Sequence, residues 1–432
     1  MIEEIDKAGL IIRQYYSFNL RERTFTMPYL SPIEKIWIVF QILFAVKELH
    51  TQHGICHGDI KMENILLNSN GTVYLSDISP YKPTYIKSDD ISTFTYFFGT
   101  NDETQGSCYL APERLLEGGK DETKTGAELF PEMDVFSLGA LFVELFIDES
   151  LFDFSKLLNY KKGTFKIEPY LDKIKNKTMR ELCRKMLIIN PKERIKLDEI
   201  IDIFTRELCP VTIPRVMLHF DTLFNTTPFW KPDMIIGCLY KHWFQIWKCL
   251  FGLDEKAPYL YQQLNLDILN KLIVRSSFSS YIERRKPGVD DTADGSISLY
   301  KFKFLFNLED TTKLDGEEEL KKDPQIFIRN DNKECITLFL HYISNNLPCV
   351  KYESSGLVAL EMMKQFSYKV KDITKLQCIV PYFLSMLKRK DNNLLCITSL
   401  HYLIEILKSI DYENLELPSV DYNIFDSYIY PG

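Results

Sequence analysis

The sequence lacks several features that would assign it at once to a class of protein. No run of apolar residues is long enough to cross a bilayer, because the longest, Ile36 to Val46, is interrupted by Gln41. No N-terminal segment has the charged-then-apolar layout of a signal peptide. The ten cysteines include no C-x-x-C pair, which is typical of reduced intracellular thiols. The 52 basic residues do not outnumber the 60 acidic ones and form no dominant block, so nucleic-acid binding is not expected.

The composition is that of a soluble globular protein, with 45% hydrophobic and 26% charged residues. A chain of 432 residues is too long for one ordinary core, so we expect two or three structural units. Helical patterns dominate from about 130 to 208, prolines interrupt them from Pro210 onward, and charged residues with Gly and Asp turns fill 283–330. We therefore predict a first domain over 1–210, a helical and irregular linker region over 211–330 that includes a partly mobile connection, and a helical domain over 331–432.

The last hundred residues contain four amphipathic helical candidates, near 333–346, 354–368, 374–389 and 392–409. They resemble two copies of one helical hairpin, since 339–343 matches 383–387 at a spacing of 44 residues, within the period of HEAT-type repeats. Two copies are fewer than such arrays usually need, and a third would begin where the sequence stops. We therefore expect a C-terminally truncated chain.

The residues that carry chemistry lie in one stretch, His57-Gly58-Asp59-Ile60-Lys61-Met62-Glu63-Asn64, followed thirteen residues later by Asp77. Phosphoryl transfer requires an aligned hydroxyl, neutralised phosphate charge and bound Mg²⁺. Asp59 would accept or orient the hydroxyl proton, and Lys61 would meet the γ-phosphate. Asn64 and Asp77 would ligate Mg²⁺ through hard oxygen atoms.

Local patterns predict the elements that hold these residues. Ser31-Pro32-Ile33-Glu34 predicts a capped helix start. The apolar runs 65–67 and 73–75 flank an Asn-Gly turn and predict a hairpin that holds Asn64 and Asp77 at one end. Further helices are expected over 134–146, with Asp134 as the N-cap, over 178–187 and over 234–250.

The joint spacing of these residues with Ala111-Pro112-Glu113, the helix at Asp134 and Arg194 resembles the eukaryotic protein-kinase fold over roughly residues 10–208. The resemblance implies that Glu113 pairs with Arg194, that Asp134 caps its helix and bonds the catalytic-loop backbone, and that His57 is structural. The resemblance favours a structural role for His57 over a metal site formed by His57 and the histidines near it. The expected fold class is mainly α, with a kinase-like C-lobe that is helical with short β hairpins, followed by α-helical HEAT-type repeats.

Three segments narrow the resemblance: Cys56–Asn64, Tyr96-Phe97-Phe98 and Cys108–Arg114. They are similar to the kinase-like regulatory subunit of the class III phosphatidylinositol 3-kinase complex, a family in which HEAT repeats and a WD-repeat propeller follow the kinase domain. The chain shows no propeller repeats. The resemblance implies ATP and Mg²⁺ as cofactors, and phosphoryl transfer to protein Ser or Thr. It also implies the phosphatidylinositol 3-kinase catalytic subunit and a Beclin-type autophagy subunit as partners. The expected location is cytoplasmic, peripheral on endosomal, autophagic or vacuolar membranes through indirect attachment, with a role in autophagy and sorting.

The chain departs from the kinase pattern in three ways. Gly58 stands where many kinases have an arginine that answers a phosphorylated activation loop, so a phosphorylation switch through it is not expected. Asp77-Ile78-Ser79 keeps the metal carboxylate but has no glycine in third place. Only Gly9, Gly54 and Gly58 precede Asp59, so the Gly-rich loop is missing, as is the strand lysine, and ATP would meet half a site.

Two explanations of the missing N-lobe stay open, an N-terminally truncated chain and a genuine loss of nucleotide binding. Truncation is favoured, because a C-lobe alone would expose apolar surface that normally packs against the N-lobe. Three functions also stay open: a scaffold kinase of the lipid-kinase complex, a free-standing Ser/Thr kinase acting on soluble proteins, and a helical adaptor with a catalytically dead kinase remnant.

Overall fold

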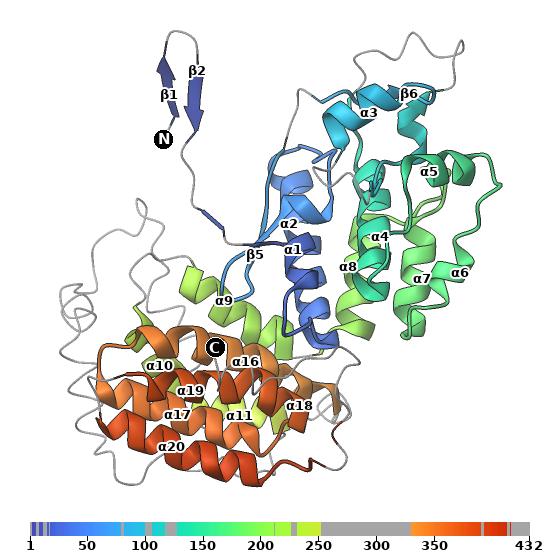
Figure 1. Ribbon diagram of the computed structural model, residues 1–432. Coiled ribbons are helices and arrows are strands. Elements are labelled where there is room, and N and C mark those ends of the chain that lie inside the picture. The colour runs from blue at the N-terminus through green and yellow to red at the C-terminus, as the bar shows by residue number, and fades with distance from the viewer. Residues whose placement is uncertain are drawn as a thin grey trace, which may run out of the picture. The chain divides into compact units, whose positions relative to one another are not determined.

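The computed structural model describes residues 2–5, 8–11, 15–16, 18–78, 82–99, 106–116, 128–210, 212–225, 231–251, 330–389, 393–412 and 415 (Figure 1). The chain divides into two compact units, Met1–Cys209 and Pro210–Gly432. The expected connection over 283–330, apart from Asn330, lies outside the described residues, as do Ser79 and the segment that ends at Gly432.

The strands of the first unit are short and form three small sheets. β1 (Ile2–Ile5) pairs antiparallel with β2 (Ala8–Ile11). β3 (Phe18–Asn19), β4 (Ile65–Leu67) and β5 (Val73–Leu75) form an antiparallel sheet in that order. β6 (Ile86–Lys87) runs parallel to β7 (Leu115–Leu116).

The predicted hairpin is confirmed in β4 and β5. In its turn the Asn68 side chain accepts the backbone N–H groups of Asn70 and Thr72, at 3.0 and 2.8 Å. Gly71 follows with φ +80°, a conformation that glycine adopts without a steric penalty. The turn therefore fixes the strand register, and the hairpin carries Asn64 and Asp77 at its open end.

The helices of the first unit are α1 (Leu20–Phe25), α2 (Pro32–Gln52), α3 (Ile91–Phe98), α4 (Pro131–Ile147), α5 (Phe154–Lys161), α6 (Glu168–Leu171), α7 (Lys177–Met186) and α8 (Leu197–Ile203), which continues as a π-helical turn over Phe204–Leu208. Every residue of α4 from Met133 to Leu145 is buried, the polar Asp134, Ser137 and Glu144 included, so this helix lies in the centre of the unit. Gly139 lets α7 approach α4 closely, since a Cβ there would lie 2.9 Å from Cβ of Met186.

The helix starts were predicted with mixed success. The capping box at α2 is confirmed, because the Ser31 hydroxyl accepts N–H of Glu34 and the Glu34 carboxylate accepts N–H of Ser31 at 2.8 Å. The prediction that Asp134 is the N-cap of a helix over 134–146 is wrong. α4 begins at Pro131, whose fixed φ suits the first helical position, with Phe130 at the N-cap.

The regular elements among the described residues of the second unit are all helical. It contains a π-helical turn (Ile213–Met217), α9 (Leu218–Asn225), α10 (Pro232–Lys241), α11 (Trp243–Phe251), a 3₁₀ segment (Asn330–Cys335), α16 (Ile336–Asn346), a 3₁₀ turn (Leu347–Cys349), α17 (Glu353–Ser367), α18 (Asp372–Thr374), a π-helical turn (Lys375–Ile379), α19 (Val380–Leu387) and α20 (Asn393–Lys408). The four helices predicted after 331 are thus confirmed, and so is the mainly α fold class.

One prediction in the second unit is wrong, since 234–250 is two helices rather than one. His242 ends α10, and both its backbone N–H and its ring Nδ1 contact the Cys238 carbonyl, at 3.1 and 2.8 Å. Such local side-chain bonds compete with helix continuation.

Hydrogen bonds connect α17, α19 and α20. The Ser399 hydroxyl on α20 donates to the Phe383 carbonyl on α19 at 2.9 Å, and the Tyr402 hydroxyl donates to Glu361 on α17 at 2.5 Å. No helix among the described residues combines the length and apolar character needed to span a bilayer.

Candidate active site

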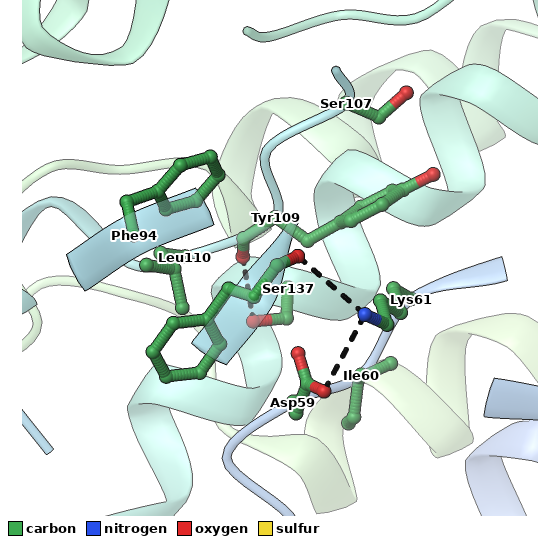
Figure 2. A pocket seen from close by; sticks show the side chains of 9 residues that line it. Asp59, Ile60, Lys61, Phe94, Ser107, Tyr109, Leu110 and Ser137 are labelled. Carbon is green, nitrogen blue, oxygen red and sulfur yellow. Dashed lines mark hydrogen bonds and ion pairs between the residues drawn. The ribbon is translucent and has the colours of Figure 1, made fainter. Parts of the chain in front are cut away.

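Asp59 lies between α2 and β4, in the stretch His57–Asn64 that is called here the catalytic loop because of its kinase-like sequence. It is 6% exposed. Its Oδ2 atom accepts from Asn64 Nδ2 at 3.0 Å and from Lys82 Nζ at 2.5 Å, and Lys61 Nζ lies 3.7 Å away. Figure 2 shows Lys61 reaching toward Asp59 across the loop. One carboxylate oxygen is therefore held by an amide and two cations.

Sequence analysis missed Lys82. The only signal was a lysine five residues after Asp77, and that spacing is not distinctive by itself. Its position beside Asp59 follows from the path of the segment Lys82–Gly99, which returns over the catalytic loop and is called here the covering segment.

A small cavity, called here the acceptor cavity, opens next to Asp59. It is lined by side chains from the catalytic loop, α3, the segment 107–110 and α4: Asp59, Ile60, Lys61, Phe94, Phe98, Ser107, Tyr109, Leu110 and Ser137 (Figure 2). The Ser137 hydroxyl donates to the Tyr109 carbonyl at 2.7 Å, which joins α4 to the segment above it. The cavity encloses about 10 Å³. Its place beside Asp59 is where a phosphoacceptor hydroxyl would have to lie.

A larger cavity of about 320 Å³ lies on the hairpin side and is lined by Tyr16, Leu66, Tyr74, Leu75, Ser76, Asp77 and Ile78. The ring of Tyr16 lies 4.7 Å from that of Tyr74, centroid to centroid. Its volume falls within the range of small-molecule sites, and its lining combines apolar side chains with one carboxylate. This is the composition that a nucleotide base and an adjoining metal would require.

Asn64 and Asp77 fit a Mg²⁺ site by their chemistry and placement. The Asn64 side chain donates through Nδ2 to the Asp59 carbonyl at 2.8 Å and to the Asp59 carboxylate, so its amide oxygen is the atom available to a cation. Ser76, the residue before Asp77, donates its N–H to the Asn64 carbonyl at 2.9 Å and so ties the two together. Asp77 is exposed and adopts φ +60°, a left-handed conformation uncommon outside glycine. Carboxylate and amide oxygens suit Mg²⁺.

His57 and Asp134 anchor the catalytic loop from below. Asp134 is fully buried, and its carboxylate accepts the backbone N–H groups of His57 and Gly58 at 2.7 and 2.8 Å. The His57 ring donates from Nε2 to the Ser76 carbonyl at 3.0 Å, while its Nδ1 accepts N–H of Asp59 at 3.3 Å. The pair thus connects α4, the catalytic loop and the end of β5.

His50, Cys56 and Asp134 have ligand atoms within 4.8 Å of one another. The arrangement does not suit a metal. The Asp134 carboxylate already accepts from two backbone amides and contacts His50 Nε2 at 2.8 Å. Burial, followed by the nearby carboxylates of Asp134 and Glu132, raises the pKa of Cys56 to about 12.

Two buried arginines, Arg194 and Arg114, bind parts of the first unit that are distant in the sequence. Arg194 contacts Glu113 through two N–H···O pairs, at 2.8 and 3.0 Å, and its side chain is fully covered. Arg114 donates to the carbonyls of Thr84 and Pro83, at 2.8 and 3.0 Å, and also to the carbonyl of Gly58. Arg114 therefore links the catalytic loop to the segment that covers it.

Arg21, on α1, is the centre of a network that sequence analysis also missed. Its guanidinium contacts Glu63 at 2.9 Å, Glu144 at 2.5 Å, the Ser107 hydroxyl at 3.0 Å and the Tyr109 hydroxyl at 2.7 Å. Burial and the neighbouring Glu144 hold the pKa of Tyr109 well above its usual value, so its hydroxyl stays protonated and donates to Glu144 at 2.6 Å. Four segments distant in sequence meet at this one side chain.

The catalytic loop, the hairpin, the covering segment and the Arg194–Glu113 pair are together characteristic of a protein kinase domain. A protein kinase domain family model matches residues 10–203, and a second model, the PIK3R4-like middle domain, matches residues 339–432.

Several curated proteins are similar to this chain in sequence. The chain is 28% identical over 463 residues to the serine/threonine-protein kinase VPS15 of Arabidopsis thaliana, which covers 99% of this chain and 29% of the relative. VPS15 of Saccharomyces cerevisiae is 28% identical over 448 residues, with 99% and 29% covered. The Schizosaccharomyces pombe kinase vps15 is 37% identical over 221 residues, with 51% and 12% covered. The chain is therefore similar to VPS15 kinases, and it spans about three tenths of the length of the first two relatives.

Proposed function

We propose that this chain is the kinase-domain and helical part of a regulatory scaffold in a phosphatidylinositol 3-kinase complex of class III, acting in autophagy and in endosomal or vacuolar sorting. One observation carries the proposal: a kinase domain and a PIK3R4-like middle domain occur together in a chain that aligns with VPS15 kinases over 99% of its length. The proposed partners are the lipid-kinase catalytic subunit and a Beclin-type subunit. The proposed location is cytoplasmic and peripheral on the corresponding membranes, with attachment through those partners.

We also propose that the scaffold transfers phosphate from ATP to protein Ser or Thr. ATP and Mg²⁺ supply the phosphoryl group and the charge that neutralises it. Asp59 would orient the acceptor hydroxyl and take its proton, and Lys61 would compensate charge on the transferred group. Asn64 and Asp77 would hold the cation, and the apolar lining of the larger cavity would hold the base. The geometry described above supports these roles because it gathers the four side chains at the ends of one loop and one hairpin.

Association is tested by tagging the natural protein at its genomic locus and purifying it under mild conditions. Recovery of a phosphatidylinositol 3-kinase catalytic subunit in stoichiometric amount is expected. A purified protein that carries no lipid-kinase activity and no such subunit would contradict the scaffold role and leave the free-standing kinase as the better account.

Phosphate transfer to protein is tested with Asp59→Asn, which keeps the shape of the side chain but removes the proton acceptor. Incorporation of phosphate into a generic Ser/Thr substrate should fall to background. Asp202→Asn, at an exposed position of α8, is the matched control and should retain full transfer. Equal transfer by both variants would exclude catalysis by Asp59, and no transfer by any form would favour the adaptor with a catalytically dead kinase domain.

A further inference from the structure

We propose that Lys82 and helix α3 form a latch that closes the acceptor cavity, and that a substrate hydroxyl can reach Asp59 only when Lys82 leaves the carboxylate and α3 moves. The proposal rests on the proposed kinase function and adds to it the regulation of that site. In the closed state the cation that neutralises Asp59 also holds the helix that covers it.

The first observation is the size of the acceptor cavity. Its volume of about 10 Å³ is the space of one water molecule. A serine or threonine side chain attached to a peptide backbone needs much more room. Phe94 and Phe98, both buried residues of α3, form part of its wall, so this helix must shift before a protein substrate can enter.

The second observation is the position of Lys82, whose side chain is 13% exposed. Besides the 2.5 Å contact with Asp59, its ammonium lies 5.5 Å from the centroid of the Phe98 ring. The guanidinium of Arg114 lies 5.0 Å from the same ring. Cations placed over an aromatic face are attracted to it, and more strongly when water is excluded. Lys82 therefore links the carboxylate of Asp59 to the last turn of α3.

The third observation is that α3 is held by one face only. It begins after Asp90, whose carboxylate accepts N–H of Thr93 at 2.9 Å, and it ends at Gly99. Ile91 and Tyr96, on the outer face, are 60% and 82% exposed. A helix of eight residues is marginal by itself in water, so its position depends on the contacts of Phe94 and Phe98 with the residues below. Loosening one of these contacts should therefore increase the population of the open state.

Hydrogen exchange read by mass spectrometry on the natural protein tests the latch. Lys82→Met keeps the length of the side chain and removes its charge, Lys82→Arg keeps the charge, and Lys87→Met is a matched control at an exposed position of the same segment. We expect amides of α3 to exchange about tenfold faster in Lys82→Met, equivalent to about 1.4 kcal/mol, and at the wild-type rate in the other two. The expected free-energy change is smaller than the full cost of breaking a buried ion pair, because Asn64 and Lys61 still compensate the charge of Asp59.

Wild-type exchange of α3 in Lys82→Met would overturn the latch. Exchange of the central helix α4 reports whether the fold is intact. If Lys82→Met loses that protection, Phe98→Leu replaces it as the test: this variant removes the ring from Lys82 without touching Asp59, and unchanged α3 exchange there refutes the proposal as well.

The exchange measurement needs no phosphate transfer, so it separates this proposal from the kinase function. Faster α3 exchange in Lys82→Met without transfer by any form supports the latch and contradicts the catalytic role. Transfer that depends on Asp59, together with unchanged α3 exchange, supports the catalytic role and contradicts the latch.

Discussion

The Arg21 network makes a quantitative prediction for the stability of the first unit. Arg21→Met removes the charge that joins α1 to Glu63, Glu144 and Tyr109, while the new side chain still fills most of the space. The Arg21 side chain is 18% exposed and that of Glu144 only 5%. The variant therefore leaves a buried carboxylate without its cation.

The expected loss follows from the partners that remain. Removing one partner of a buried ion pair costs about 3–5 kcal/mol. Glu144 keeps the hydrogen bond from the Tyr109 hydroxyl, and the Arg21 side chain is partly exposed to water. We therefore expect a loss of unfolding free energy at the lower end of that range, about 3 kcal/mol. For a unit of 150–250 residues this corresponds to a fall in Tm of about 6–12 °C.

The assay must report on the first unit alone, because both units contribute to a global melting curve. Exchange of the α4 amides in increasing urea gives the unfolding free energy of the helix that carries Glu144. Arg206→Met is the control: Arg206 is 63% exposed, pairs with Asp202 at 3.1 Å, and should cost less than about 1 kcal/mol.

A double-mutant cycle with Glu144→Gln completes the test. Combining it with Arg21→Met removes both charges, so the double variant should be less destabilised than the sum of the single variants by about 1 kcal/mol or more. A loss in Arg21→Met no greater than that of Arg206→Met, or strictly additive effects, would refute the view that this network is a coupled buried ion pair.

Three further predictions concern single positions. Arg194→Lys should destabilise the first unit by about 1–3 kcal/mol in the same assay, because lysine cannot make the two parallel contacts with Glu113, and a variant as stable as wild type would contradict this. Gly58→Ala should cost about 1–3 kcal/mol, because φ is +73° and the added Cβ would overlap Leu129, and full stability would show that the loop adapts without strain. Burial lowers the pKa of His242 to about 4 from an ordinary value of 6.5, so the unfolded chain binds the proton first and the second unit should lose about 3 kcal/mol as the pH falls from 6.5 to 4. His242→Gln should lose that part of the pH dependence in acid unfolding curves of the second unit, and an unchanged slope would contradict the assignment.

Local chemistry explains which elements could be predicted. The Ser31 capping box, the Asn-Gly turn and the amphipathic periods after 331 each depend on residues a few positions apart, and all three were found. Asp134 was misplaced because an acidic residue before an apolar run matches an N-cap, although Pro131 had already started the helix. The other expectation for Asp134 is confirmed, because its carboxylate accepts the backbone N–H groups of His57 and Gly58. That long-range role came from the kinase resemblance, since no local pattern encodes it.

The same distinction applies to the site. The spacing of Asp59, Lys61 and Asn64, with Asp77 beyond the hairpin, was visible in the sequence, because the proposed phosphoryl transfer requires those residue types at fixed positions along one loop. Lys82 beside Asp59 and the gathering of Glu63, Tyr109 and Glu144 around Arg21 were not visible.

The sequence by itself thus determined the class of protein and the residues of its catalytic loop, since both depend on short, nearly contiguous patterns. Only the tertiary structure decided that Asp59 faces a cavity with room for little more than a water molecule, and that a lysine from the covering segment neutralises it. The physical reason is that burial and charge compensation arise only when the fold brings distant side chains together. The strength of such a charge interaction depends on how far the fold excludes water from it.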